Sequence, residues 1–174
     1  MRYFLLDLNP ACTKPPRILN NFDDIRKKDI NLKNCHAIKK RVVFNVENLA
    51  GTIFTDIITQ PFLLFSQRVM DITRKYAPHT VCKQTLLLDK ENNMPYIYFL
   101  PILPRIDCIS DKSELNNGRT KFIRPVIHAD KIKDLNIFWL DKFNSDLPVI
   151  TLDLAESILR RETKGINLTQ VELV

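Results

Sequence analysis

Hydrophobic residues are grouped in short runs between polar or proline-containing stretches, and this spacing predicts many strands and few helices. Tyr3 to Leu8 forms the first run, which Asn9-Pro10 stops, and Arg41 to Val46 is a second run rich in β-branched and aromatic residues. We expect further strands at Val81–Leu88, Tyr96–Leu100, Lys121–Ile127, Asn136–Leu140, Pro148–Thr151 and Asn167–Leu173.

Two segments have the spacing of helices. Ser66 is a suitable N-cap for a first helix, which Pro78 ends. Its buried stripe is expected to contain Val69, Met70, Thr73 and Tyr76. In the second helix, Asp153 and Glu156 stand three residues apart, as in a capping box, and Gly165 is expected to provide a left-handed stop. Its buried stripe is expected to contain Leu154, Ile158 and Leu159.

The two helical segments share a weak internal repeat. Pro61 and Pro148 each precede an apolar run, a cap residue five positions on, a helix of about three turns, a breaker and a strand. This order favours a mixed sheet with helices packed against it. The predicted fold is therefore α+β, a mixed and mainly antiparallel sheet with two or three packed helices. With 174 residues, of which 45% are hydrophobic, we expect one domain over residues 1–174.

Residues 9–40 are predicted to form a long, basic, irregular connection that contains Pro15-Pro16. Residues 1–41 hold ten Lys or Arg and four Asp or Glu, whereas residues 42–174 hold sixteen of each, so this first quarter carries the whole net charge of +6. Such a cluster raises the encounter rate with an acidic partner, although a solvated loop explains it as well. The candidate partner-binding residues are Arg26, Lys27, Lys28, Lys39, Lys40 and Arg41. Between Lys27 and Arg41 there is no aromatic residue to stack on a base, so an acidic protein is favoured over nucleic acid.

Motifs that carry chemistry are scarce. Only three glycines occur, so no glycine-rich loop can cradle a phosphate. The histidines and the four cysteines are dispersed without the spacing of metal ligands, and the cysteines are expected to be reduced and buried. Asp107 and Asp111 are more typical of turn residues than of an acid and base pair. Trp139 is interpreted as a core residue. We therefore expect no catalytic residues, no metal and no cofactor.

The amino-terminal apolar run is interrupted by Asp7 after four residues, too early for a secretory signal. The chain also lacks the run of about 18 apolar residues that a membrane helix requires. The sequence thus predicts a cytoplasmic protein that does not enter a membrane.

The order of several segments resembles an immunity-protein family of bacterial polymorphic toxin systems, formerly catalogued as a domain of unknown function. The resemblance is clearest between Pro61 and Gly165 and rests on hydrophobic patterns with a few polar marks. Its segments are Pro61–Ser66 before a helix, Pro95-Tyr96, Ile106-Asp107-Cys108-Ile109, Ile137–Leu140, Pro148–Thr151 and a capped final helix. It implies a small cytoplasmic protein that binds and blocks a toxin enzyme encoded beside it.

Two alternatives remain open. A nucleic-acid-binding accessory protein would use the basic amino-terminal segment, and its binding would weaken steeply with salt. A hydrolase would need a site assembled in space from Asp107, His128 or Ser110.

Overall fold

A computed structural model describes residues 1–19, 24–118, 122–141 and 147–174. Within these ranges there are two α-helices, α1 (Gln67–Tyr76) and α2 (Leu152–Leu159). The same ranges contain the three short 3₁₀ helices η2 (Lys27–Asp29), η3 (Cys35–Ala37) and η4 (Ala129–Ile132). The strands are β1 (Tyr3–Leu8), β2 (Arg17–Ile18), β3 (Arg41–Glu47), β4 (Ile57–Ile58), β5 (Leu64–Ser66), β6 (Val81–Asp89), β7 (Met94–Ile102), β8 (Arg105–Ile106), β9 (Glu114–Leu115), β10 (Phe122–Arg124), β11 (Val126–Ile127), β12 (Ile137–Leu140), β13 (Pro148–Thr151) and β14 (Ile166–Leu173).

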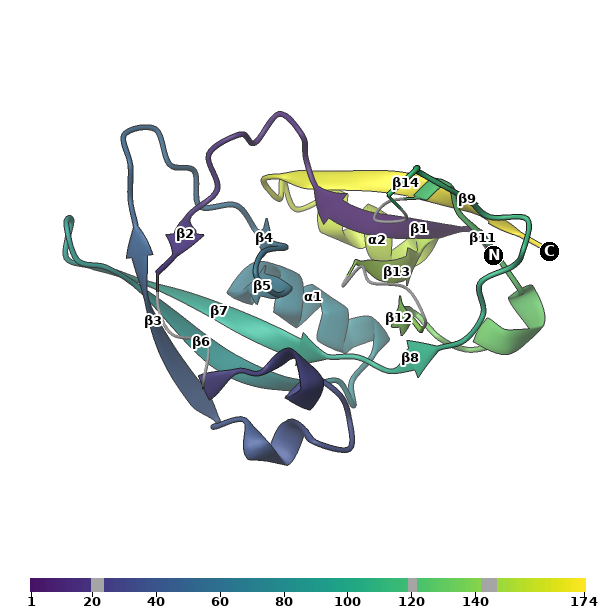
Figure 1. Ribbon diagram of the computed structural model, residues 1–174, viewed down its shortest axis with the longest axis horizontal. Coiled ribbons are helices and arrows are strands. Elements are labelled where there is room, and N and C mark those ends of the chain that lie inside the picture. Colours follow the sequence, from purple (N-terminus) through teal and green to yellow (C-terminus); the bar gives the residue numbers. More distant parts are fainter. Residues whose placement is uncertain (20–23, 119–121, 142–146) are drawn as a thin grey trace.

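The strands form two six-stranded sheets and one small pair. Figure 1 shows how the labelled strands are arranged in space. The first sheet has the order β2-β3-β6-β7-β5-β4 and the second has the order β11-β14-β1-β13-β12-β8; β9 pairs with β10. Most strand pairs are antiparallel, but β3–β6, β11–β14 and β8–β12 are parallel. The α+β class is confirmed, with two α-helices. The expectation of one sheet is wrong, because β1 and β7 each become the centre of a separate sheet.

Most of the predicted elements are found within one or two residues of their expected ends. Ser66 Oγ accepts the Val69 N–H at 3.3 Å and so caps α1 as predicted. Trp139 is 1% exposed and belongs to the core. The predicted strand from Lys121 begins among residues that the structure does not describe, and its described part is divided between β10 and β11.

Three details of the second helix differ from the prediction. Thr151, not Asp153, is the N-cap, and α2 ends at Leu159, well before Gly165. Leu159 is 50% exposed, because the helix is short and its last residue passes the edge of the core. Gly165 does have a positive φ of 78°, but it lies directly before β14, and Glu162 has a positive φ nearer the helix end.

The first and second sheets are built from one structural repeat. The first repeat contains β3, β4, β5, α1, β6 and β7 in chain order. The second repeat contains β11, β12, β13, α2 and β14, and β1 takes the place of β7. In each repeat, the strand before the helix (β5 or β13) pairs antiparallel with the strand that precedes it (β4 or β12) and with the central strand (β7 or β1). The central strand also pairs antiparallel with the strand after the helix (β6 or β14). That last strand is parallel to the outer strand, β3 or β11. The weak sequence repeat thus corresponds to a repeated topology.

The central strands β7 and β1 contain the same tripeptide at equivalent positions. Tyr98 stands opposite Ser66, the cap of α1, and Tyr3 stands opposite Thr151, the cap of α2. Each tyrosine begins the sequence Tyr-Phe-Leu. Both rings are 4% exposed, and burial is the main cause that raises the pKa of both hydroxyls. The chain therefore supplies the same core strand twice, once from its interior and once from its first residues.

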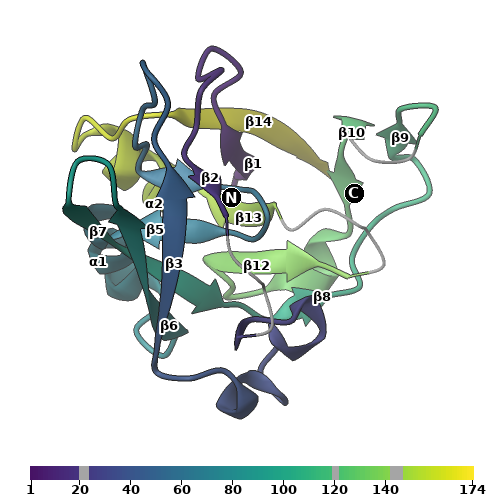
Figure 2. The same cartoon turned by 60° about the vertical axis from the view of Figure 1, so that its left-hand side comes forward.

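The two repeats share one core. The helices α1 and α2 pack against each other, α1 also against β5 and β7, and α2 also against β13 and β1, as Figures 1 and 2 show. The Tyr76 hydroxyl is hydrogen bonded to Ser157 Oγ across the helix pair. The largest buried cluster contains residues of both repeats, among them Phe44, Phe65, Trp139 and Leu154. Neither helix in the described ranges is long and apolar enough to cross a membrane.

Candidate functional site

The predicted basic residues lie in two groups that the fold brings together. Lys27 and Lys28 belong to η2 and Arg26 directly precedes it, whereas Lys39 and Lys40 lead into β3, which begins at Arg41. Lys39 Nζ binds Asp24 Oδ1 at 2.7 Å, which ties the start of β3 to the chain just before η2. Both groups thus belong to one surface, which we call the basic surface and define as residues 24–41.

Several contacts hold the basic surface in a fixed shape. Arg26 Nε donates to Asp29 Oδ2 at 2.8 Å, and Asp29 is only 8% exposed. Ile25, Ile30 and Ile38 are buried in the main core. The predicted irregular connection is therefore anchored from Asp24 onward by its isoleucines, while residues 20–23 lie outside the described part of the chain. A segment anchored in this way presents its charges without a large ordering cost on binding.

Strand β6 supports the other end of the basic surface. Lys83 Nζ donates to the Ile38 carbonyl at 2.8 Å, and Gln84 N–H donates to the Lys40 carbonyl at 3.0 Å. Arg41 Nε donates to Gln84 Oε1 at 2.6 Å. Sequence reasoning missed Lys83 and Gln84, because only the parallel pairing of β3 with β6 brings them to residues more than forty positions earlier.

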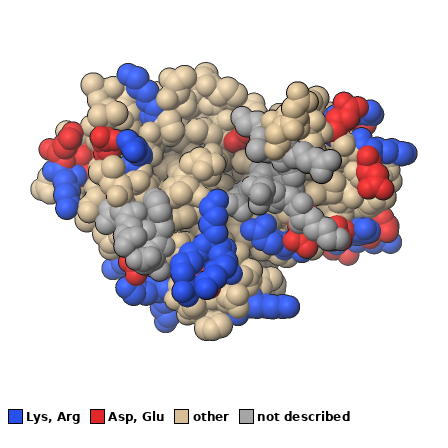
Figure 3. Space-filling model, in the orientation of Figure 1, with Lys and Arg blue, Asp and Glu red and all other residues tan. Residues whose placement is uncertain are grey.

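The basic surface carries seven Lys or Arg and two Asp, a net charge of +5. Figure 3 shows Lys and Arg side chains gathered over the lower part of the view, where Figure 1 places η2 and the start of β3. The side chains of Lys28, Lys33 and Lys40 make no hydrogen bond or ion pair with any described residue, and all three are exposed. Cations without an acidic neighbour keep their attraction for an external anion.

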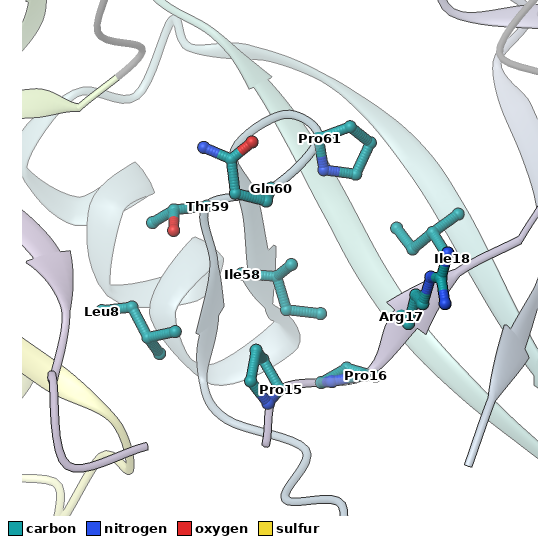
Figure 4. Close-up of a pocket in the computed structure, with 9 residues that line it drawn as sticks. All are labelled: Leu8, Pro15, Pro16, Arg17, Ile18, Ile58, Thr59, Gln60 and Pro61. Carbon is teal, nitrogen blue, oxygen red and sulfur yellow. The ribbon is translucent and has the colours of Figure 1, made fainter. Parts of the chain in front are cut away.

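A pocket of about 310 Å³ lies between β2 and β4, the two edges of the first sheet. Figure 4 shows Ile58 of β4 and the pair Pro15-Pro16 on facing sides of it. Its lining consists of Leu8, Pro15, Pro16, Arg17, Ile18, Ile58, Thr59, Gln60 and Pro61. Because most of these side chains are apolar, the pocket suits an apolar group and not a phosphate or a metal ion.

The segments that carry Ser110 and His128, two residues of the hydrolase alternative, lie side by side. Ile109 bridges Ile127, which places Ser110 and His128 on neighbouring segments. Ser110 Oγ accepts the Lys112 N–H at 3.3 Å, and the His128 N–H donates to the Cys108 carbonyl at 2.8 Å. Burial raises the pKa of the Cys108 thiol to about 11. A protonated, fully buried thiol is a poor nucleophile.

Asp107, the acid of that alternative, and Asp111 are both exposed. In the part of the chain that the structure describes, no group of three or more His, Cys, Asp or Glu is arranged to hold a metal ion. The basic surface is therefore the feature with the clearest capacity for recognition, because it concentrates charge on an anchored segment. A comparison of the sequence with models of known families and with curated proteins gives no match.

Proposed function

We propose that this protein is a non-enzymatic immunity protein that binds and neutralises a cognate bacterial toxin, and that the basic surface forms part of the contact. The observation that carries the proposal is the concentration of seven cations and two acids on residues 24–41, held in place by the core. Charge of one sign on a fixed segment raises association rates with a partner of opposite charge. The expected partner face is therefore acidic.

The resemblance of the segments between Pro61 and Gly165 to an immunity-protein family supports the same proposal. Proteins of this kind act by occupying a toxin surface, so they need a stable fold and a recognition face and no reaction centre. The placement of Ser110 in a local turn agrees with this, because its hydroxyl is engaged by the Lys112 N–H.

Growth rescue tests the proposal directly. The product of each neighbouring gene is expressed in bacteria with and without this protein. One such product should arrest growth alone and be tolerated in the presence of this protein, and the two should co-purify. If no neighbouring product arrests growth, or none is neutralised, the proposal is wrong.

Charge reversal tests whether the basic surface takes part. Lys28→Glu combined with Lys40→Glu changes the local charge by four without removing an ion pair to a described residue. This variant should lose most of its protection at a given expression level. Lys112→Glu combined with Lys133→Glu is a matched control, because both residues are exposed and lie outside the basic surface. Equal protection by the two variants would exclude the basic surface from the contact.

A nucleic-acid-binding accessory protein is the second candidate, and the same net charge of +5 favours it. Its affinity for duplex or single-stranded nucleic acid should fall steeply as salt rises, because bound counterions are released. The lack of an aromatic residue between Asp24 and Arg41 places it second. Binding that is detectable at low salt and abolished by the Lys28 and Lys40 reversals would favour it over the toxin partner.

A further inference from the structure

A row of three apolar side chains crosses the outer part of the first sheet. Val43 of β3 stands opposite Leu86 of β6, and Leu86 stands opposite Ile97 of β7. Residues directly opposite each other in a sheet point to the same face. We call this set the apolar row.

Helix α1 packs on the same face of the sheet but does not extend over the apolar row. The Arg74 guanidinium lies 5.9 Å from the centre of the Phe99 ring, and Phe99 points to the same side as Ile97, two residues earlier in β7. Beyond this contact the sheet is open: Val43 is 44% exposed and Ile97 is 48% exposed, and Leu86 is half-buried. The apolar row is thus a sheet surface that the helix does not reach.

The second repeat shows that the fold does not require apolar residues at the positions of Leu86 and Ile97. Glu172 is the equivalent of Leu86 and pairs with Val126, the equivalent of Val43. Its carboxylate accepts two hydrogen bonds from Arg124, at 2.7 and 2.6 Å, and these hold the pKa of Glu172 below its usual value. Arg2 precedes Tyr3 and so takes the place of Ile97. The positions of Leu86 and Ile97 are thus charged in the second repeat and apolar in the first, whereas the position of Val43 is apolar in both and is only 2% exposed at Val126.

Cations border the apolar row on the side of α1. Arg41 lies two residues before Val43 on the same face of β3, and its side chain is exposed. Arg74 of α1 donates to Cys82 Sγ at 2.9 Å and so reaches across the same face. An apolar centre with a charged rim is the usual composition of a protein interface. Arg41 also belongs to the basic surface, so the two features are continuous.

We infer that the apolar row is the centre of a protein interface and that its occupant is a partner surface with an apolar middle and carboxylates at its rim. This rests on the proposed function in one respect, namely that the protein acts by binding another protein. A second copy of this chain fits less well, because pairing two such faces would bring Arg41 and Arg74 of both copies together.

The dye 8-anilinonaphthalene-1-sulfonate tests the recognition chemistry, since it joins an apolar ring system to an anion. Val43→Thr combined with Ile97→Thr keeps β-branched residues in the strands and makes the row polar. The double variant should lose most of the dye fluorescence, and Arg41→Gln should weaken binding several-fold. Ile123→Thr, at a residue 66% exposed on β10, is the control and should leave the fluorescence unchanged. Wild-type fluorescence equal to that of the double variant would overturn the inference.

A photo-cross-linking residue at position 97 identifies the occupant in living cells, with position 123 as the control site. The expected result is one acidic protein cross-linked from position 97 and not from 123, and lost in Arg41→Glu. A cross-linked second copy, cross-linked nucleic acid or no product would overturn the inference. Cross-linking without growth rescue would refute the toxin as partner and leave the interface standing. Growth rescue without cross-linking would refute the interface alone.

Discussion

Asp56 and Asn136 have equivalent positions in the two repeats and make the same contacts. The Asp56 carbonyl accepts the Ser66 N–H at 2.8 Å, and the Asn136 carbonyl accepts the Thr151 N–H at 3.0 Å. The Ser66 hydroxyl donates to Asp56 Oδ1 at 2.6 Å, and the Thr151 hydroxyl donates to Asn136 Oδ1 at 3.3 Å. Each side chain thus fixes the residue that caps the helix of its own repeat.

The second polar atom of each side chain binds the opposite repeat. Asp56 Oδ2 accepts the Lys164 N–H at 2.7 Å, shortly before β14, and Asn136 Nδ2 donates to the Tyr76 carbonyl at 2.8 Å, at the end of α1. The repeats are therefore joined by two reciprocal hydrogen bonds as well as by the apolar core.

Asp56→Ala should lower the free energy of unfolding by about 2 kcal/mol, because it removes hydrogen bonds to a charged group from both Ser66 and Lys164. Urea denaturation measures this change. Asp71→Ala, at an exposed aspartate on α1, is the control and should change stability by no more than about 0.5 kcal/mol. A similar loss of stability in both variants would show that the hydrogen bonds of Asp56 contribute nothing specific to the free energy of unfolding.

Tyr98→Phe should cost more than Tyr3→Phe. The Tyr98 hydroxyl donates to the Thr55 carbonyl at 2.7 Å, whereas the Tyr3 hydroxyl is 3.4 Å from the Ile132 carbonyl. Both rings are equally buried, so the variants differ mainly in hydrogen-bond quality. We expect a loss of about 1 kcal/mol at position 98 and a smaller one at position 3. Thermal or urea unfolding of both variants gives the comparison, and the reverse order would contradict it.

Gly165→Ala should be far more destabilising than Gly51→Ala. Both glycines have positive φ, 78° and 85°, so both substitutions strain the backbone by about 1 kcal/mol. At position 165 an added Cβ would also lie 2.6 Å from Thr55 Cβ in the buried core, whereas at position 51 its nearest neighbour is the end of the flexible Lys14 side chain, at 3.3 Å. The difference between the unfolding midpoints of the two glycine variants measures this clash. Equal midpoints would mean that the core moves to accept the methyl group.

Protonation of Asp89 should make the protein less stable in acid. Hydrogen bonds from the Asn92 side chain, with further ones from Asn48 and the Asn92 and Glu91 N–H groups, lower the pKa of the carboxyl below its usual value. Its contribution is full above the pKa of an unfolded aspartate, about 3.9. It is lost as pH falls through the lower folded value. Asp89→Asn should therefore destabilise the protein at pH 7 and much less at pH 2.5. An equal effect at both pH values would contradict this.

Local patterns placed most strands and both helices, because alternation, caps and breakers act within a few residues. Ser66 as a cap and Trp139 as a core residue were both predictable in this way. Thr151 as the cap of α2 was not, because Asp153 and Glu156 have the spacing of a capping box that begins two residues later. The sequence also did not indicate that Leu159 lies outside the core, since the spacing of apolar residues does not show where a helix stops packing against neighbouring elements.

The sequence by itself determined which residues are strand-forming, which are charged and that the charge lies in residues 1–41. Only the tertiary structure decided that β1 replaces β7 in a second repeat, because strand pairing between distant segments depends on loop closure and core packing. It also decided which face of β3 is open. Val43 and Phe44 are adjacent and both apolar, yet Phe44 is 1% exposed and Val43 is 44% exposed. The core covers the face of the strand that carries Phe44, whereas α1 stops short of the face that carries Val43.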